Sequence, residues 1–243
     1  MAAATRGEEM RAVILAGGTG TRLRPYTTVL PKPLVPVADR PILELVLRQL
    51  AHHGFTRIDL SVGHLGGLIK AYLDSIDLPK GLELRYVWED APLGTAGALK
   101  MIEDLDEPFL AMNGDVLTTL DFAQLMRFHR GHEGGLTIAT HRKNVDIDLG
   151  VIESDDGFVK NYVEKPTMRF DVSMGIYVYD PDVAELIPPR HFDFPDVVNA
   201  MLEAGRKVAV YTGPGVWFDI GTVGEHERAT AEIEAHPEIF ADV

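Results

Sequence analysis

A glycine-rich loop with cations close behind it is the first stretch of the sequence that could do chemistry. The loop, GGTG at 17–20, follows a strand-like apolar run at 12–16, and Arg22 and Lys32 come soon after it. Glycines remove β-carbons where a chain turns sharply, and they expose successive backbone N–H groups that can hold phosphate oxygens. The pattern predicts a site for a phosphorylated ligand.

Two prolines, Pro31 and Pro33, flank Lys32 and limit the flexibility of its backbone. The loop is not a Walker P-loop, because no Gly-Lys-Ser/Thr follows it. It is not the dinucleotide fingerprint either, because a third glycine is missing and no helix opens directly after the loop. The glycines alone would fit an ordinary strand-to-helix turn equally well, but a pinned lysine beside exposed N–H groups favours a functional site.

Two aspartates far apart in the sequence each follow a predicted strand. Asp115 ends the stretch Asn-Gly-Asp after the strand at 109–112, and Asp219 follows the strand at 216–218. Either one alone could cap a turn or a helix. Together, beyond the carboxyl ends of two strands, they could hold Mg²⁺ with substrate phosphates and waters.

The elements that would position these residues alternate between strand and helix through the first half. Strands are expected at 12–16, 57–62, 82–87 and 109–112, with helices at 41–53 (capped by Asp39), 64–76 and 95–103. The second half is richer in strands, expected at 135–141, 151–154, 158–163, 172–179, 207–211 and 216–218, with helices at 181–187, 195–203 and from 223. This order predicts an α/β fold with one continuous, mixed but mainly parallel, Rossmann-like sheet flanked by helices.

Composition excludes several classes of function. Among 243 residues, 37 are acidic and 23 are basic, so the formal net charge of −14 opposes binding to nucleic acid or to an anionic membrane. There is no cysteine, which rules out disulfides and thiolate chemistry. No apolar run is long enough to span a bilayer, and residues 1–9 lack the apolar centre of a signal peptide. These features predict a cytoplasmic enzyme with small-molecule substrates.

The loop and its lysine closely resemble the signature of sugar-1-phosphate nucleotidylyltransferases. The resemblance rests on GGTGTRLRP at 17–25 and PKP at 31–33, and further pieces recur in order through almost the whole chain from Met10. It implies a nucleotidyltransferase fold, similar to that of GT-A enzymes, with a strand-rich sugar lobe. We therefore expect a flexible extension at 1–9 and one domain at 10–243, in which 10–133 mainly bind nucleotide and 134–243 mainly bind sugar phosphate.

The resemblance also implies roles for individual residues. Arg22, Lys32, Asp115 and Asp219 would be catalytic, and the two aspartates would bind Mg²⁺. The nucleotide would contact Leu15, Ala16, Gly17, Gly18, Thr19, Gly20, Thr21, Arg22, Glu89, Gly94, Thr95, Asn113 and Gly114. The sugar phosphate would contact Gly150, Glu164, Lys165, Ser173 and Gly175. Many members of the family are dimers or tetramers, so a homodimer is possible.

The base and the sugar are less well defined by the sequence. The stretch LGTAG at 93–97 resembles mannose- and heptose-type guanylyltransferases, which favours GTP over the other nucleotides. Ser173 stands where many members carry asparagine, so we expect its contacts with the sugar to differ from theirs.

Two other functions are alternatives. A regulatory paralogue would bind a nucleotide sugar without turnover, but it should lack some of the charged site residues, all of which are present here. A GT-A glycosyltransferase would carry an Asp-x-Asp motif; Asp146-Ile147-Asp148 has this pattern, in a polar stretch away from the nucleotide loop. His129 and His132 are expected on the solvated face of a helix and not at a metal site, because no partner completes a zinc set.

Overall fold

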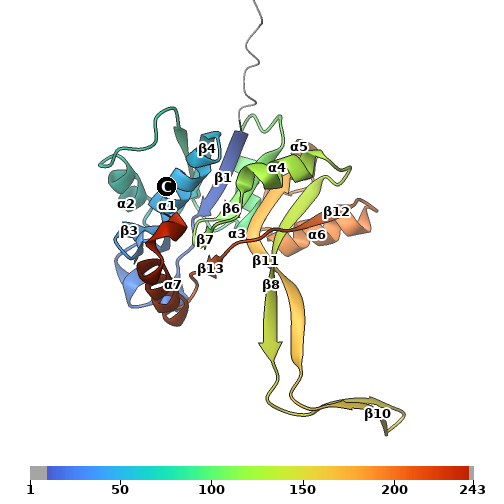
Figure 1. Ribbon diagram of the computed structural model, residues 1–243. Coiled ribbons are helices and arrows are strands. Elements are labelled where there is room, and N and C mark those ends of the chain that lie inside the picture. The colour runs from blue at the N-terminus through green and yellow to red at the C-terminus, as the bar shows by residue number, and fades with distance from the viewer. Residues whose placement is uncertain (1–9, 241–243) are drawn as a thin grey trace, which may run out of the picture.

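A mixed, mainly parallel sheet forms the centre of the computed structural model, which describes residues 10–240 (Figure 1). The extension predicted at 1–9 lies outside the described residues. The order of the seven strands is β12-β8-β11-β6-β1-β4-β5. Their bounds are β1 Met10–Ala16, β4 Phe55–Val62, β5 Glu83–Trp88, β6 Phe109–Asn113, β8 Leu136–Asp146, β11 Thr167–Tyr179 and β12 Val208–Thr212. All neighbours pair in parallel except β11, which is antiparallel to β6 and β8, so the predicted fold class is confirmed.

Helices cover both faces of this sheet because alternate residues of the buried strands point to opposite sides. Ala12 and Ile14 of β1 pack in one apolar cluster, whereas Val13 packs in the other. The first cluster takes side chains from α1 Ile42–His52, α2 Gly66–Leu73, α4 Phe122–Arg130 and α7 Val223–Ala235. The second takes them from α3 Gly94–Gly97, the 3-10 helix Ala98–Met101, α5 Pro181–Glu185 and α6 Phe194–Glu203.

The expectation of one continuous sheet holds for seven of the ten predicted strands, whereas those expected at 151–154, 158–163 and 216–218 lie outside it. Three two-stranded ladders stand outside the central sheet: β2 Pro36–Val37 with β3 Arg40–Pro41, β7 Val116–Thr118 with β13 Trp217–Asp219, and β9 Val151–Asp155 with β10 Phe158–Val163. Turns that contain Gly114, Gly150 and Pro166 separate β7, β9 and β10 from the sheet strands next to them in the chain, and glycine and proline commonly interrupt a strand.

Two local predictions for helices also need correction. The first helix begins at Ile42 with Pro41 at its N-cap, so Asp39 does not cap it and instead belongs to the turn between β2 and β3. The helix expected at 95–103 divides into the short α3 and a 3-10 turn. Gly97 lies at this junction, and glycine is a weak helix former.

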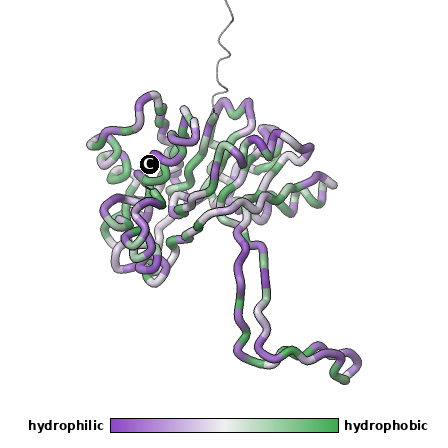
Figure 2. Tube along the Cα trace, in the orientation of Figure 1, coloured by the Kyte–Doolittle hydropathy of each residue, from purple (hydrophilic) through white to green (hydrophobic). Residues whose placement is uncertain are grey.

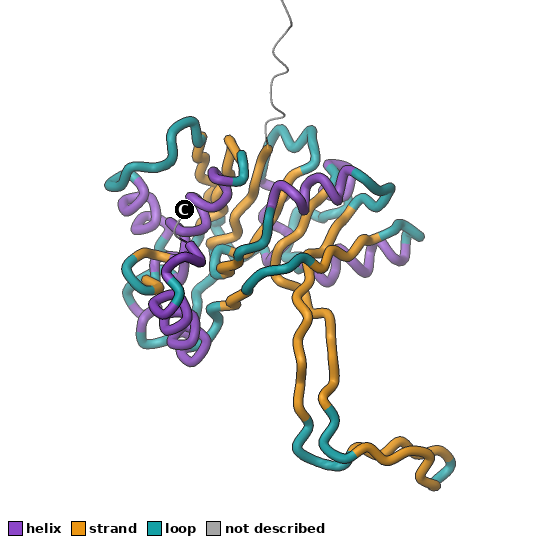
Figure 3. The backbone as a smooth tube through the Cα atoms, in the orientation of Figure 1, coloured by secondary structure: helices purple, strands orange, loops and turns teal. Residues whose placement is uncertain are grey.

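Strands β8 and β11 continue well beyond the body of the molecule, further than the 135–141 and 172–179 expected from the sequence. They stay paired to Asp146 and Thr167, and the β9–β10 hairpin follows at their far end. We call residues 140–173 the arm. Figures 1 and 3 show it projecting from the central sheet, with the hairpin turned to one side.

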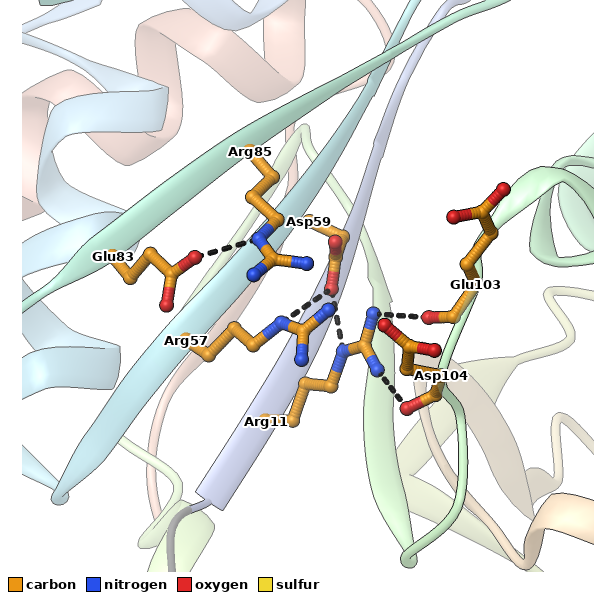
Figure 4. Close-up of polar contacts among 7 residues, drawn as sticks. All are labelled: Arg11, Arg57, Asp59, Glu83, Arg85, Glu103 and Asp104. Atoms are coloured by element: carbon orange, nitrogen blue, oxygen red, sulfur yellow. Dashed lines mark hydrogen bonds and ion pairs between the residues drawn. The ribbon is translucent and has the colours of Figure 1, made fainter.

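At the opposite end of β1 from the glycine loop, arginines connect the neighbouring strands β1 and β4 with the segment that precedes β6 (Figure 4). The buried Asp59 accepts a 2.6 Å hydrogen bond from Arg11, whose guanidinium also donates to the carbonyl groups of Glu103 and Asp104. Arg57 lies 4.0 Å from the same carboxylate. These partners satisfy Arg11, so the cluster anchors the sheet at the end away from the loop.

The helices within residues 10–240 are all too short or too polar to cross a membrane.

Candidate active site

The β7–β13 ladder brings the two predicted aspartates together. Asp115 lies directly before β7, and Asp219 ends β13 in register with Val116. The backbone N–H of Ile220 also donates to the carbonyl oxygen of Asp115, at 3.1 Å. The ladder thus makes neighbours of two residues that are 104 positions apart in the chain.

Lys32 joins this pair through its ammonium group, which donates to Oδ2 of Asp115. The backbone around Lys32 is held in place by Leu23 and Leu34, whose side chains are buried in the core. Gly20, with φ of +61°, packs so closely that a β-carbon there would lie 3.0 Å from Cβ of Lys32. The glycine loop and the segment of Lys32 therefore pack directly against each other.

The carboxylates of Asp115 and Asp219 lack interactions that a cation would supply. Oδ1 of Asp115 is buried and has no hydrogen-bond partner among residues 10–240. Burial, with a further contribution from the nearby Asp115, raises the pKa of Asp219 above its usual range. Within residues 10–240 no three histidine or acidic side chains form a metal site, so a divalent ion here would need ligands from a substrate, as Mg²⁺ sites commonly do.

Beside these residues is a cavity of about 300 Å³. Its lining contains many residues that the sequence predicted: Leu15, Gly17, Gly18, Arg22, Glu89, Gly94, Thr95, Asn113 and Asp115. Pro92 also lines it and was not predicted, since nothing in its local pattern distinguishes it from a turn proline. The cavity lies beyond the carboxyl ends of β1, β5 and β6, where open α/β sheets bind ligands.

The other residues predicted to contact the nucleotide lie in the backbone segments around this cavity and do not line it; they are Ala16, Thr19, Gly20, Thr21 and Gly114. Ala16 is buried at the end of β1, while Thr19 and Thr21 are exposed along the loop. The N–H of Gly114 donates to the carbonyl oxygen of Leu15 at 2.9 Å, and a β-carbon at Gly114 would lie 3.1 Å from that oxygen.

Glu89 fixes the position of the first loop glycine. Its carboxylate accepts a 2.6 Å hydrogen bond from Ser61 and a 3.2 Å bond from the N–H of Leu93. A β-carbon added to Gly17 would lie 2.6 Å from Oε1 of Glu89. A side chain at position 17 would therefore have to displace the Glu89 carboxylate from its hydrogen bonds, whereas a β-carbon on Gly18 would meet nothing within 4 Å.

The loop at 93–97 is anchored by a segment that sequence reasoning did not connect with it. The N–H of Thr95 donates to Asp193 at 2.9 Å, and the N–H of Phe194 donates to the hydroxyl of Thr95 at 2.8 Å. A β-carbon at Gly94 would approach the carbonyl oxygen of Phe192 to 2.7 Å. Glycine here serves packing against residues 190–193, and Gly94 and Thr95 also face the cavity.

The predicted sugar-phosphate residues are not brought into this cavity. Gly150, Glu164 and Lys165 lie where the arm meets its hairpin. There the hydroxyl of Tyr162 donates to Glu164 at 2.7 Å, and it stands 2.1 Å from where a β-carbon of Gly150 would be. Lys165 has a φ of +44°, rare for a residue with a side chain. These three residues lie close together at one corner of the arm.

Ser173 and Gly175 lie at the base of the arm, where the pairing of β11 with β8 shifts register. Their contacts are internal: the hydroxyl of Ser173 accepts from the N–H of Gly175 and donates to the hydroxyl of Tyr177, both at 3.2 Å. Gly175 has a φ of +71°, and a β-carbon there would lie 2.7 Å from Nδ2 of Asn113.

The expectation of a solvated helix face for His129 and His132 is wrong. His129 is buried at the end of α4 and contacts Thr137 at 2.8 Å and Asp180 at 3.2 Å, while His132 lies beyond the helix. Burial lowers the pKa of His129, although the carboxylate of Asp180 opposes this effect.

The geometry is that of an α/β protein with a glycine-rich loop, a lysine and two neighbouring carboxylates beside one cavity. The family model of the nucleotidyl transferases matches residues 11–236. The chain belongs to this nucleotidyl transferase family, as the resemblance of its motifs indicated.

Curated relatives have names that point to sugar 1-phosphates. The chain is 33% identical over 221 residues to the probable mannose-1-phosphate guanylyltransferase 3 of Oryza sativa subsp. japonica, covering 87% of this chain and 61% of that protein. It is 35% identical over 224 residues to a mannose-1-phosphate guanylyltransferase catalytic subunit beta of Drosophila pseudoobscura pseudoobscura, covering 89% and 60%. The chain thus spans about three fifths of the length of these relatives.

Among solved structures, HddC from Yersinia pseudotuberculosis is similar, with a TM-score of 0.73 and 26% identity. The match covers 92% of this chain and 99% of that one. A putative glucose-1-phosphate thymidylyltransferase from Bacillus anthracis, solved with sucrose, gives a TM-score of 0.71 and 27% identity over 92% and 94% of the two chains.

Proposed function

We propose that this protein transfers a nucleoside monophosphate from a nucleoside triphosphate to a hexose or heptose 1-phosphate, giving an NDP-sugar and pyrophosphate. The observation that carries the proposal is the meeting of Lys32, Asp115 and Asp219, from three distant segments, beside a cavity lined by the glycine loop. The guanylyltransferase names of the relatives support GTP as the nucleotide.

The reaction needs little acid–base chemistry from the protein. A phosphate oxygen of the sugar 1-phosphate attacks the α-phosphorus of the triphosphate, and the bond from that phosphorus to the oxygen of the leaving pyrophosphate breaks. The attacking group is already anionic at neutral pH, so no general base is required. Catalysis consists of aligning two anions that repel each other and stabilising charge on the leaving group.

Residues of the part expected to bind nucleotide, 10–133, hold the triphosphate. The N–H groups of residues 17–21 and the guanidinium of Arg22 bind its phosphates. Lys32 stabilises charge at the α-phosphate. Glu89, Gly94 and Thr95 lie on the side of the cavity assigned to the base, and Asn113 lines it beside the loop. Gly114 would act by holding the backbone of Leu15, to which its N–H donates.

Asp115 and Asp219 are the residues that would hold Mg²⁺. The ion would neutralise charge on the phosphate oxygens when bound. The buried, unpartnered Oδ1 of Asp115 and the raised pKa of Asp219 support this assignment, because a cation would relieve both.

The sugar 1-phosphate is assigned to residues 134–243. Lys165 would hold the attacking phosphate, and Glu164 would accept hydrogen bonds from sugar hydroxyls. Gly150, Ser173 and Gly175 would lie against the sugar. A reaction of this kind between small metabolites is consistent with a cytoplasmic location, which stays a prediction.

A pyrophosphate-release assay tests the proposal. The purified protein is incubated with Mg²⁺, each of the common nucleoside triphosphates and a panel of hexose and heptose 1-phosphates. We expect release with GTP and at least one sugar 1-phosphate. Binding of a nucleotide sugar without any release would point to a regulatory paralogue, and transfer from an NDP-sugar to an alcohol would point to a glycosyltransferase.

A further inference from the structure

The arm has two faces of different character. In the β8–β11 ladder, Val145 is paired with Met168, Lys143 with Phe170 and His141 with Val172, which places these six side chains on one face. We call this the apolar arm face, since only Lys143 and His141 among them are polar. Figure 2 shows apolar residues interrupting polar ones along the arm.

The other face of the arm is polar and internally satisfied. Arg142 pairs with Asp171 at 3.4 Å, and Thr167 donates to Asp146 at 2.6 Å. Alternation of this kind is typical of a sheet that has one face in water and the other against protein. The apolar arm face should therefore be covered when the protein is assembled.

Within the single chain, this face is largely open to water. Val145 is 40% exposed, Met168 41% and Phe170 48%. The hairpin beyond it exposes Ile152, Phe158, Val159 and Tyr162 to still larger extents. A two-stranded hairpin is at best marginally stable alone in water, so the arm needs a third surface.

The chain's own body is poorly placed to supply that surface. The β8–β11 ladder is continuous with the central sheet from Leu136 and Tyr179 outward to Asp146 and Thr167, with one register shift. At the corner, the N–H of Ile147 donates to the carbonyl oxygen of Pro166 at 3.0 Å. Bringing Lys165 back to the cavity of the same chain would require breaking this ladder.

We propose that two copies of this chain exchange arms, so that the corner bearing Gly150, Glu164 and Lys165 completes the cavity of the other copy. The inference rests on the proposed function for the role of these residues. It explains two observations together: a cavity that Gly150, Glu164 and Lys165 do not line, and an arm with an uncovered apolar face. Exchange of an identical element is a common route to a closed dimer.

Complementation between two inactive variants tests the exchange. Lys32→Ala disables the cavity, and Lys165→Ala disables the corner of the arm. The two variants are coexpressed with different tags, and mixed dimers are purified through both tags. If arms are exchanged, one site of each mixed dimer carries both defects and the other carries none, so we expect about half of the wild-type activity per dimer.

If each arm served its own chain, both sites of the mixed dimer would keep one defect and activity would stay as low as in the separate variants. That result would overturn the exchange and leave the proposed function intact. An inactive wild type would instead contradict the proposed function, and the exchange is then decided by the oligomeric state alone.

Oligomeric state is measured by light scattering on purified protein, with variants on the two faces of the arm. We expect the wild type to be a dimer and Phe170→Gln, on the apolar arm face, to shift it toward monomer at least tenfold in dissociation constant. Arg169→Gln, next to it on the polar face, is the matched control and should leave the dimer unchanged. A monomeric wild type, or equal effects of both variants, would contradict the proposal.

Discussion

The ammonium group of Lys32 donates a hydrogen bond to the carboxylate of Asp115, although the two residues are 83 positions apart in the chain. In the free protein each of these groups compensates part of the charge of the other. A phosphate can compete for the lysine, and a cation can compete for the aspartate. Binding of substrate and metal would thus replace one internal ion pair by two new contacts, one from Lys32 to a phosphate and one from Asp115 to the cation.

Removing the amine of Lys32 should lower turnover strongly. We expect Lys32→Ala to reduce kcat by about a hundred- to a thousandfold, the usual effect of losing one preorganised stabiliser of transition-state charge. Steady-state pyrophosphate release measures this. Lys70→Ala, at an exposed lysine paired with Asp74, is the control and should retain normal activity. A Lys32→Ala enzyme with near-normal kcat would remove this residue from the mechanism, and the same test applies to Asp115→Ala.

Asp219→Asn should raise the stability of the metal-free protein at neutral pH and lower its activity. Burial and Asp115 raise the pKa of Asp219, so its ionised form is disfavoured in the folded state. Wild-type stability is then lost as pH rises from the unfolded pKa, about 4, through the raised folded value. We expect the metal-free variant to resist urea better than the wild type at neutral pH, with the advantage vanishing near pH 4, while its turnover falls.

The exposed Asp74→Asn variant is the control for this comparison. Adding Mg²⁺ should stabilise the wild type more than Asp219→Asn, because a ligand that binds only the folded state adds to its stability. A metal-free Asp219→Asn protein that is less stable than wild type at neutral pH would refute the electrostatic account of this site.

Gly17→Ala should cost stability where Gly18→Ala does not. The new methyl group would collide with the Glu89 carboxylate, which is held by Ser61 and by the N–H of Leu93. Loss of these hydrogen bonds should lower the free energy of unfolding by about 1–2 kcal/mol. Thermal unfolding of both variants measures this, and Gly17→Ala combined with Glu89→Ala should recover part of the loss. Equal unfolding temperatures for the two single variants would contradict the packing argument.

His129 should make the protein sensitive to mild acid. Its pKa is lowered by burial, so its neutral form stabilises the fold above the unfolded pKa of about 6.5, and this stability is lost as pH falls through the lower folded value. We expect urea midpoints to fall between about pH 7 and pH 5, and to fall less in His129→Gln. His236→Gln, at an exposed position, should keep the wild-type slope.

The sequence predicts the parts of this protein that depend on local pattern. The apolar strands, the glycine loop and the proline-flanked Lys32 are contiguous signals, and their relation to Asp115 follows from strand ends meeting at one edge of a sheet. Asp219 was found by its position after a strand, and the family resemblance supported it.

What the sequence could not predict depends on contacts between distant segments. The anchoring of Thr95 by Asp193 joins two loops 98 positions apart, and neither loop has a pattern that points to the other. The burial of His129 depends on Thr137 and Asp180, which lie on other elements. The length of the arm was also missed. Alternation of polar and apolar residues indicates which face of a strand is covered, but it does not show what covers that face or how far the strand continues beyond the core.

The most direct test of the central claim is the stoichiometry of one reaction. The wild-type protein is incubated with GTP, Mg²⁺ and mannose 1-phosphate, or the sugar 1-phosphate found active in the panel, and pyrophosphate and NDP-sugar are quantified together. The account predicts that they form in equal amounts and that neither forms without the sugar 1-phosphate. Formation of phosphate or pyrophosphate at the same rate when the sugar 1-phosphate is omitted would contradict it.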